Sequence, residues 1–166
     1  SSGTLLMVRK GSHNRKIFGR VALITAGTSD VRVAAETMHI LTYFGVEYDR
    51  YFDCGVAGLH RSIGAAKSIL DGDYDVAIVY AGMEGALASV IASLLPIPVI
   101  GVPTSNGYGH AGKGESALSS MLQCCVPGLT VLNIDNGVGA AAAAVRILFS
   151  MERKKIYSLN SMEESN

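Results

Sequence analysis

AGMEGALASVIASLLPIPVIGVPTSNGYGHAGKG, residues 81–114, is the stretch that decides the fold. It follows an apolar run at residues 76–80 and contains a second apolar run at residues 98–102. Between the two runs, apolar side chains recur at spacings of three and four, which predicts an amphipathic helix. The pattern therefore predicts a strand, a crossover helix and a second, parallel strand, with a glycine-rich loop after each strand.

The sequence on either side repeats this alternation. Further strands are predicted at residues 21–24, 46–52 and 129–134. Helical spacing follows at residues 33–44, 63–70, 117–122 and 140–150. Five strands alternating with five helices predict a doubly wound α/β domain. We expect a flavodoxin-like three-layer sandwich whose five-stranded parallel sheet has the order 2-1-3-4-5.

The predicted α/β domain occupies residues 20–150. Residues 1–19 are expected to be a lead-in, either a tag remnant or the end of an upstream domain. Residues 151–166 are polar and are expected to form a solvated C-terminal tail.

Composition narrows the class of protein. A chain of 166 residues with 49% apolar and 17% charged residues is the size of one globular domain. Its formal net charge of +0 gives no electrostatic support for nucleic-acid binding. No unbroken apolar stretch reaches the roughly 18 residues that a membrane span needs. The three cysteines lack metal-ligand spacing, so we expect free thiols in a reducing compartment, the cytoplasm or an organelle.

The loops after the strands supply the candidate site, because ligands of open α/β sheets bind at the carboxyl ends of the strands. Glu84 is notable there, since folding needs no charge at that position. Residues 28–30 enter a helix and suit a capped turn and a phosphate cradle equally well. The polar side chains expected at this rim are Ser29, Asp30, His60, Arg61, Glu84, Thr104, Ser105, Tyr108, His110 and Lys113.

Two of these positions invite a specific question. Arg61 near the start of a helix opposes the helix dipole, so a nearby anion would explain it, although a solvated side chain is the alternative. Cys125 reaches the rim only if the helix before it folds back or if a second subunit delivers it. An inert core thiol is the alternative, whereas a thiol together with Glu84 would suit covalent catalysis with proton transfer.

Six motifs, taken together and in this order, resemble the catalytic domain of the LarB family, the pyridinium-3,5-biscarboxylic acid mononucleotide synthases. That domain is similar to the PurE family of N5-carboxyaminoimidazole ribonucleotide mutases. The resemblance covers about residues 20–149, and its motifs are AGTSD (26–30), GVAGLHR (55–61), AGMEGAL (81–87), VPTSNGYG (102–109), CVPG (125–128) and NIDNGVGA (133–140).

The resemblance implies a reaction of nickel-pincer cofactor biosynthesis. In it, the pyridinium ring of nicotinic acid adenine dinucleotide is carboxylated at C5 with CO₂ or bicarbonate, and the phosphoanhydride is cleaved to release AMP. Cys125 would add to the ring and Glu84 would remove the ring proton. The substrate contacts implied or expected at the rim are Gly27, Thr28, Ser29, Asp30, Gly58, His60, Arg61, Gly82, Met83, Thr104, Ser105, Tyr108 and His110.

The resemblance further implies Mg²⁺ on the pyrophosphate, with Asp30 as its ligand, and a homo-octamer with sites at subunit contacts. Three features depart from the family pattern. Family members carry an upstream domain, Cys124 precedes the proposed nucleophile, and residues 110–115 are more polar than the corresponding family loop.

Two other functions fit the sequence. A PurE-like enzyme acting on an aminoimidazole ribonucleotide needs no thiol. That family has a histidine in its third loop, where this chain has AGMEGALAS, and this difference counts against the alternative. A noncatalytic module would bind a dinucleotide, or assemble, without turnover.

Overall fold

The structure, a computed structural model, describes residues 17–110 and 112–163, with side chains through residue 154. Five strands alternate with five α-helices along the chain, and two short 3₁₀ turns precede α1 and α2. The elements are β1 (Arg20–Thr25), η1 (Thr28–Asp30), α1 (Val31–Tyr43), β2 (Glu47–Tyr51), η2 (Val56–Gly58), α2 (Leu59–Leu70), β3 (Val76–Ala81), α3 (Ala86–Leu94), β4 (Val99–Pro103), α4 (Glu115–Leu122), β5 (Leu129–Val131) and α5 (Gly137–Glu163).

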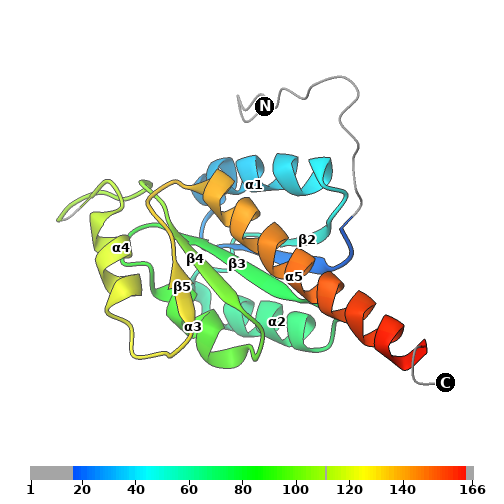
Figure 1. Cartoon of the computed structure of the whole chain (residues 1–166). Helices are drawn as coiled ribbons and strands as arrows, with labels where there is room; N and C mark the ends of the chain where they lie inside the picture. Colours follow the sequence, from blue (N-terminus) through cyan, green and yellow to red (C-terminus); the bar gives the residue numbers. More distant parts are fainter. Residues whose placement is uncertain (1–16, 111, 164–166) are drawn as a thin grey trace.

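The sheet has the order β2-β1-β3-β4-β5 and every pair of neighbouring strands is parallel. Helices cover both of its faces, α1 and α5 on one side and α2 and α3 on the other (Figure 1). The predicted doubly wound fold and its strand order are therefore confirmed. Parallel connections require this layering, because each crossover helix must pack back on the sheet.

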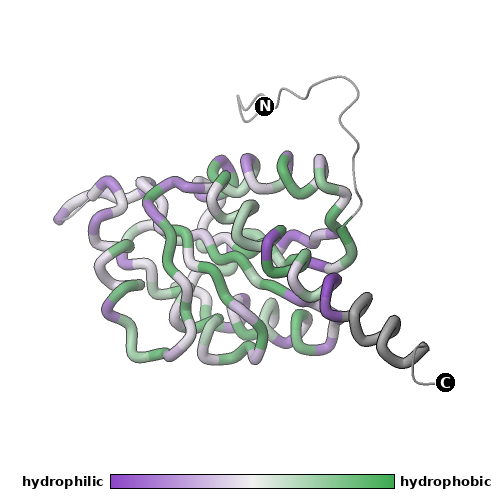
Figure 2. Tube along the Cα trace, in the orientation of Figure 1, coloured by the Kyte–Doolittle hydropathy of each residue, from purple (hydrophilic) through white to green (hydrophobic). Residues whose placement is uncertain are grey.

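The central strands β1, β3 and β4 are buried along almost their whole length, and the tube in Figure 2 is correspondingly hydrophobic through the middle of the sheet. One core lies under α2 and α3 and includes Ile69, Leu87 and Ile91. The other lies under α1 and α5 and includes Leu41 and Leu148. Each fully buried side chain of this kind contributes about 1.5–3 kcal/mol of transfer free energy.

Three boundaries differ clearly from the prediction: the start of the folded domain, the end of β5 and the end of α5. Ile17, expected in a solvated lead-in, is buried, and its N–H donates to the Phe44 carbonyl at 3.2 Å. Strand β5 ends at Val131, although Leu132 N and Asp135 N still donate to Gly101 O and Pro103 O of β4. Between them the ladder is interrupted, and Asn133 Oδ1 accepts from Ile134 N at 2.9 Å. Residues 1–16 of the predicted lead-in lie outside the described residues.

Helix α5 does not stop near residue 150 but continues to Glu163. The reason is local, since residues 140–163 contain no glycine or proline to end the helix. Among the residues that the structure describes, no helix is long and apolar enough to cross a membrane.

Candidate functional site

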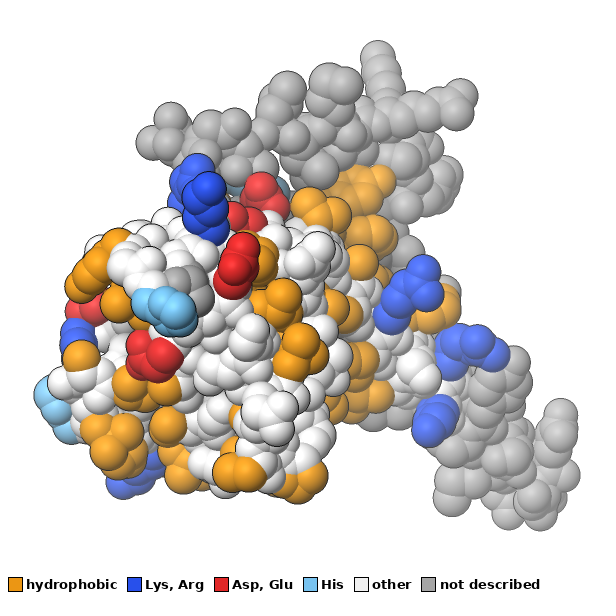
Figure 3. All heavy atoms as spheres, turned by 90° about the vertical axis from the view of Figure 1, so that its left-hand side faces the viewer, with side chains coloured by type: hydrophobic (Ala, Val, Ile, Leu, Met, Phe, Trp, Pro, Cys, Tyr) orange, Lys and Arg blue, Asp and Glu red, His pale blue; other side chains and the backbone are white. Residues whose placement is uncertain are grey.

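The loops after β1, β2, β3 and β4 enclose a pocket of about 250 Å³ at the carboxyl end of the sheet, named the rim pocket. Figure 3 looks onto this end of the molecule, where acidic, basic and histidine side chains are scattered among apolar ones. The wall of the pocket is mostly small and apolar. Its residues are Ala26, Gly27, Ser29, Asp30, Gly55, Val56, Ala57, Ala81, Gly82, Met83, Glu84, Ala86, Leu87 and Asn106.

Asp30 joins the first and fourth loops from the inside. Asp30 is only 3% exposed. One carboxylate oxygen accepts a hydrogen bond from Gly27 N at 2.8 Å. The other accepts from Thr104 Oγ1 at 2.6 Å and from Asn106 Nδ2 at 3.2 Å. Three donors satisfy this buried charge, so the carboxylate fixes one loop to the other.

Glu84 occupies the third loop in contrasting surroundings. It is exposed, and it makes no hydrogen bond or ion pair with the residues that the structure describes. The turn that presents it is tight: Gly85 N donates to Gly82 O at 2.9 Å, and Met83 has a left-handed φ of 51°. A non-glycine residue in that conformation stores strain, which is common at functional turns.

The third loop also lies directly against the fourth. A Cβ added to Gly82 would come within 2.8 Å of Asn106 O and 2.9 Å of Thr104 Oγ1. Real Cβ atoms essentially never approach so closely, so only glycine allows this contact. The position of Glu84 is therefore linked to the loop that Asp30 holds.

In the second loop, the Arg61 guanidinium forms an ion pair with the Asp53 carboxylate. The anion expected near the start of α2 therefore comes from the protein itself. The loop closes on β1 through a hydrogen bond from Cys54 N to Thr25 O at 2.8 Å. His60 and Arg61 are both exposed and neither lines the rim pocket.

The three thiols differ in exposure. Cys54 is buried, and burial raises the pKa of its thiol, which opposes formation of the reactive thiolate. Cys125 is exposed and lies between the end of α4 and the start of β5. That connection is at the amino end of the sheet, opposite the rim pocket. Helix α4 does not fold back, and one copy of the chain does not bring Cys125 to Glu84.

The structure thus divides the predicted site residues into two groups. Those that line the rim pocket are Gly27, Ser29, Asp30, Gly82, Met83 and Glu84. Those that do not are Thr28, Gly58, His60, Arg61, Thr104, Ser105, Tyr108, His110 and Cys125. Asn106 lines the pocket and was missed, because an asparagine in a glycine-rich loop is an ordinary turn residue and gives no separate signal.

Charge in the rim pocket has one sign. Among the described residues that line it, the ionisable side chains are Asp30 and Glu84, without a lysine, arginine or histidine. An acidic, largely apolar pocket favours a neutral or cationic ring over an anionic group. Phosphate groups of a ligand would have to bind outside this wall or on backbone N–H groups.

A resident metal ion does not fit these residues. Within residues 17–110 and 112–163, no group of three or more histidine, cysteine, aspartate or glutamate side chains could hold one. Asp30 is buried and already accepts three hydrogen bonds. Magnesium stays a prediction only for an ion that arrives with the phosphates of a substrate.

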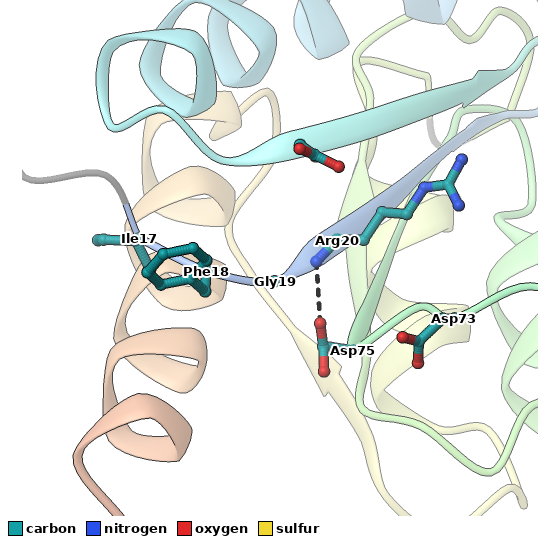
Figure 4. Close-up of a pocket in the computed structure, with 7 residues that line it drawn as sticks. Ile17, Phe18, Gly19, Arg20, Asp73 and Asp75 are labelled. Carbon is teal, nitrogen blue, oxygen red and sulfur yellow. Dashed lines mark hydrogen bonds between the residues drawn. The ribbon is translucent and has the colours of Figure 1, made fainter. Parts of the chain in front are cut away.

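A second hollow lies at the amino end of the sheet, where β1 begins (Figure 4). It has a volume of about 280 Å³ and contains Asp73, Asp75 and Arg20. Arg20 N donates to Asp75 Oδ2 at 2.9 Å, as the dashed line in Figure 4 marks. The Arg20 side chain forms an ion pair with the Asp49 carboxylate. These contacts hold strands together, and the hollow lies away from the loops that carry Glu84.

The chain belongs to the AIR carboxylase family, which it matches over residues 20–166. The predicted similarity to the PurE family is therefore confirmed, whereas the assignment to the LarB family stays a prediction. The N5-carboxyaminoimidazole ribonucleotide mutase of Methanocaldococcus jannaschii is 36% identical over 131 residues, which cover 77% of this chain and 78% of the mutase.

An uncharacterized protein of the same organism is more similar, at 48% identity over 139 residues. The match covers 84% of this chain and 53% of that protein, so the chain spans about half the length of this relative. Crystal structures of Treponema denticola PurE and of a PurE2 variant superpose with TM-scores of 0.67 and 0.68. Each match covers 89% of this chain at 20% or 19% identity, which establishes a shared fold.

Proposed function

We propose that this chain catalyses carboxylation-type chemistry on a nucleotide bound at the rim pocket, with Glu84 transferring the proton. The observation that carries the proposal is the setting of Glu84. It is an exposed carboxylate, without a partner among the described residues, on a strained turn beside a largely apolar pocket, in a chain of the AIR carboxylase family. A carboxylate free of partners is available as a general acid or base.

An aminoimidazole ribonucleotide is the first candidate substrate. Its support comes from the named relatives, because the mutases of Methanocaldococcus jannaschii and Pyrococcus horikoshii are each 36% identical to this chain. Such a reaction moves a carboxyl group to a ring carbon and takes a proton from that carbon. Glu84 would accept the proton, and no thiol would take part.

A pyridinium ring, as in nicotinic acid adenine dinucleotide, is the second candidate. The acidic lining of the rim pocket favours it, since a cationic ring is attracted to carboxylates without any basic partner. Two relatives from Methanocaldococcus jannaschii also favour the pyridinium substrate. The mutase of that organism is 36% identical to this chain, whereas a separate, uncharacterized protein of the same organism is 48% identical.

In the pyridinium reaction, the Cys125 thiolate would add to the ring and convert it into an enamine. The enamine carbon would then attack CO₂, Glu84 would remove the proton from that carbon, and the thiolate would leave as aromaticity returns. Water would cleave the phosphoanhydride and release AMP. CO₂ or bicarbonate is the co-substrate, and Mg²⁺ would bind the pyrophosphate oxygens.

This mechanism requires a second copy of the chain, because Cys125 and Glu84 lie at opposite ends of one subunit. Exposed apolar side chains support assembly into an oligomer, for which the octamer is the proposed form. Leu59, Ile63 and Leu70 are each about half exposed on the outer face of α2. Leu122, near Cys125, is also exposed. Apolar surface of this kind is typical of subunit contacts.

The test compares both candidate reactions in parallel. The chain is incubated with Mg²⁺ and one of three substrates: N5-carboxyaminoimidazole ribonucleotide labelled with ¹³C in its carboxyl group, aminoimidazole ribonucleotide with ¹³C-bicarbonate, or nicotinic acid adenine dinucleotide with ¹³C-bicarbonate. Products labelled on a ring carbon are identified by mass spectrometry. Labelled dicarboxylated mononucleotide with AMP, lost in Cys125→Ser, would establish the pyridinium reaction. Labelled aminoimidazole product that survives Cys125→Ser would establish the first candidate. Binding of a nucleotide without any labelled product would contradict the proposal and favour a noncatalytic module.

A further inference from the structure

Asn106 has an unusual position between the first and fourth loops. Its amide nitrogen donates to Ser29 O at 3.0 Å and to Asp30 Oδ1 at 3.2 Å. Ser29, Asp30 and Asn106 all line the rim pocket. Both acceptors therefore belong to the wall of the same cavity, and both amide hydrogens have partners in the protein.

These two contacts fix the orientation of the amide. If the group were rotated by half a turn, Oδ1 would face a carbonyl oxygen and a carboxylate oxygen, and three acceptors would repel one another. The remaining polar atom of the side chain is then Oδ1, which accepts hydrogen bonds only. It has no partner among the residues that the structure describes.

Oδ1 must also reach solvent. No buried side-chain nitrogen or oxygen of the described residues lacks a hydrogen-bond partner. An Oδ1 without a partner is therefore at least partly accessible, and the cavity that Asn106 lines is the rim pocket. The result is one acceptor of fixed orientation at a cavity whose wall is otherwise largely apolar.

We propose that Asn106 is a substrate-specificity residue, whose Oδ1 accepts a hydrogen bond from an O–H or N–H donor of the bound nucleotide. The inference rests on the proposed function, which places a nucleotide in the rim pocket. Ribose hydroxyls are donors in both candidate substrates, and the aminoimidazole ring adds an exocyclic amine. Phosphate oxygens offer no donor, so this acceptor orients the sugar or ring and not the phosphate end.

Thr104 provides a matched control, because it holds the same carboxylate without reaching the ligand. It is fully buried, donates to Asp30 Oδ1 at 2.6 Å, and does not line the rim pocket. Thr104→Val and Asn106→Ala each remove one hydrogen bond from Asp30. Only Asn106→Ala also removes the acceptor at the pocket, so a merely structural effect would be shared by the two variants.

The experiment measures dissociation constants by calorimetry for the wild-type chain and both variants. The probes are aminoimidazole ribonucleotide, nicotinic acid adenine dinucleotide, their ribose-deoxy analogues, and imidazole ribonucleotide, which lacks the amine. We expect the wild type to prefer the parent nucleotide over one analogue by about tenfold, the effect of one hydrogen bond. Asn106→Ala should abolish that preference and Thr104→Val should keep it.

The analogue that loses affinity identifies the donor, a deoxy form indicating ribose and imidazole ribonucleotide indicating the amine. An unchanged preference in Asn106→Ala, or no preference in the wild type, would overturn the inference. Asn106→Gln, which displaces the acceptor by one methylene, replaces the alanine variant if that variant unfolds. Binding and selectivity without carboxylation would refute the proposed reaction and leave Asn106 in its role, whereas no binding would refute both.

Discussion

The loop after β1 and the loop after β3 each contribute one carboxylate to the rim pocket, and the two carboxylates differ in burial and in partners. Asp30 is buried and accepts three hydrogen bonds. Glu84 is exposed and has no partner among the described residues. A carboxylate whose lone pairs are occupied stabilises the loops that hold it, whereas a free carboxylate can exchange protons with a ligand.

Glu84→Gln should reduce turnover without reducing stability. The amide has nearly the same shape but cannot accept a proton, so turnover should fall by about 10²–10⁴-fold. The free energy of unfolding should stay within about 0.5 kcal/mol of the wild-type value, as for other surface substitutions. Steady-state rates and denaturant titrations measure the two effects. A variant that retains turnover would remove Glu84 from the chemistry.

Asp30→Asn should have the opposite signature. The amide NH₂ would replace one of the two oxygens and would therefore face either the Gly27 N–H or the Thr104 and Asn106 donors, leaving at least one buried donor unsatisfied. We expect a loss of about 2–3 kcal/mol in the free energy of unfolding, measured in urea. Thr104→Val, which removes one of the three hydrogen bonds, should cost less. Equal stability of Asp30→Asn and the wild type would show that the buried carboxylate does not hold the first and fourth loops together.

Gly82→Ala tests the contact that couples the two carboxylate loops. The new Cβ would meet Asn106 O and Thr104 Oγ1 at 2.8 and 2.9 Å, which forces the loops apart. We expect a cost of about 1–3 kcal/mol from overpacking, together with reduced turnover because Glu84 moves. Gly109→Ala serves as the matched control for the space around a loop glycine, since its Cβ position is open. Because Gly109 has a φ of 73°, Gly109→Ala incurs only the cost of placing a side chain in a left-handed backbone conformation.

Alkaline pH extends the comparison to a buried hydroxyl in the core under α1 and α5. Tyr80 is fully buried and donates to Thr37 Oγ1, and burial raises the pKa of its hydroxyl. The folded state therefore favours the protonated phenol. This contribution to stability is fully present below about pH 10, the ordinary tyrosine value, and is lost as the pH rises above it.

Tyr80→Phe should accordingly be less stable than the wild type by about 1 kcal/mol at neutral pH, because one hydrogen bond is lost. The difference should shrink as the pH rises above about 10. Urea titrations across the pH range measure it, and Cys54 and Tyr74, whose pKa values are also raised by burial, cancel between the two proteins. A difference that grows with pH would contradict the assignment.

Strand order, layering and the loops that form the site could all be predicted from the sequence, because apolar periodicity and the right-handed crossover rule determine them. The boundaries that failed depend on local detail. The regular ladder of β5 stops at Val131, where an Asn133 side-chain hydrogen bond to Ile134 N follows, and α5 continues because residues 140–163 contain no glycine or proline.

The roles of the two carboxylates could not be predicted in the same way. Asp30 is buried by contacts with Thr104 and Asn106, which lie 74 and 76 residues further along the chain. Such partners follow from the exact approach of two loops, which periodicity does not specify. Cys125 presents the same difficulty, since its connection lies at the far end of the sheet and only a second copy could bring it to Glu84.

If Glu84 transfers the proton while Asp30 holds the loops together, a paired measurement on two variants should separate the two roles. The rate of ¹³C incorporation and the free energy of unfolding are determined on the same preparations of Glu84→Gln and Asp30→Asn. We expect Glu84→Gln to lower the rate of ¹³C incorporation and to leave the free energy of unfolding unchanged. We expect Asp30→Asn to lose stability and, per folded molecule, to retain more activity than Glu84→Gln. A Glu84→Gln protein that incorporates label at the wild-type rate would contradict the account.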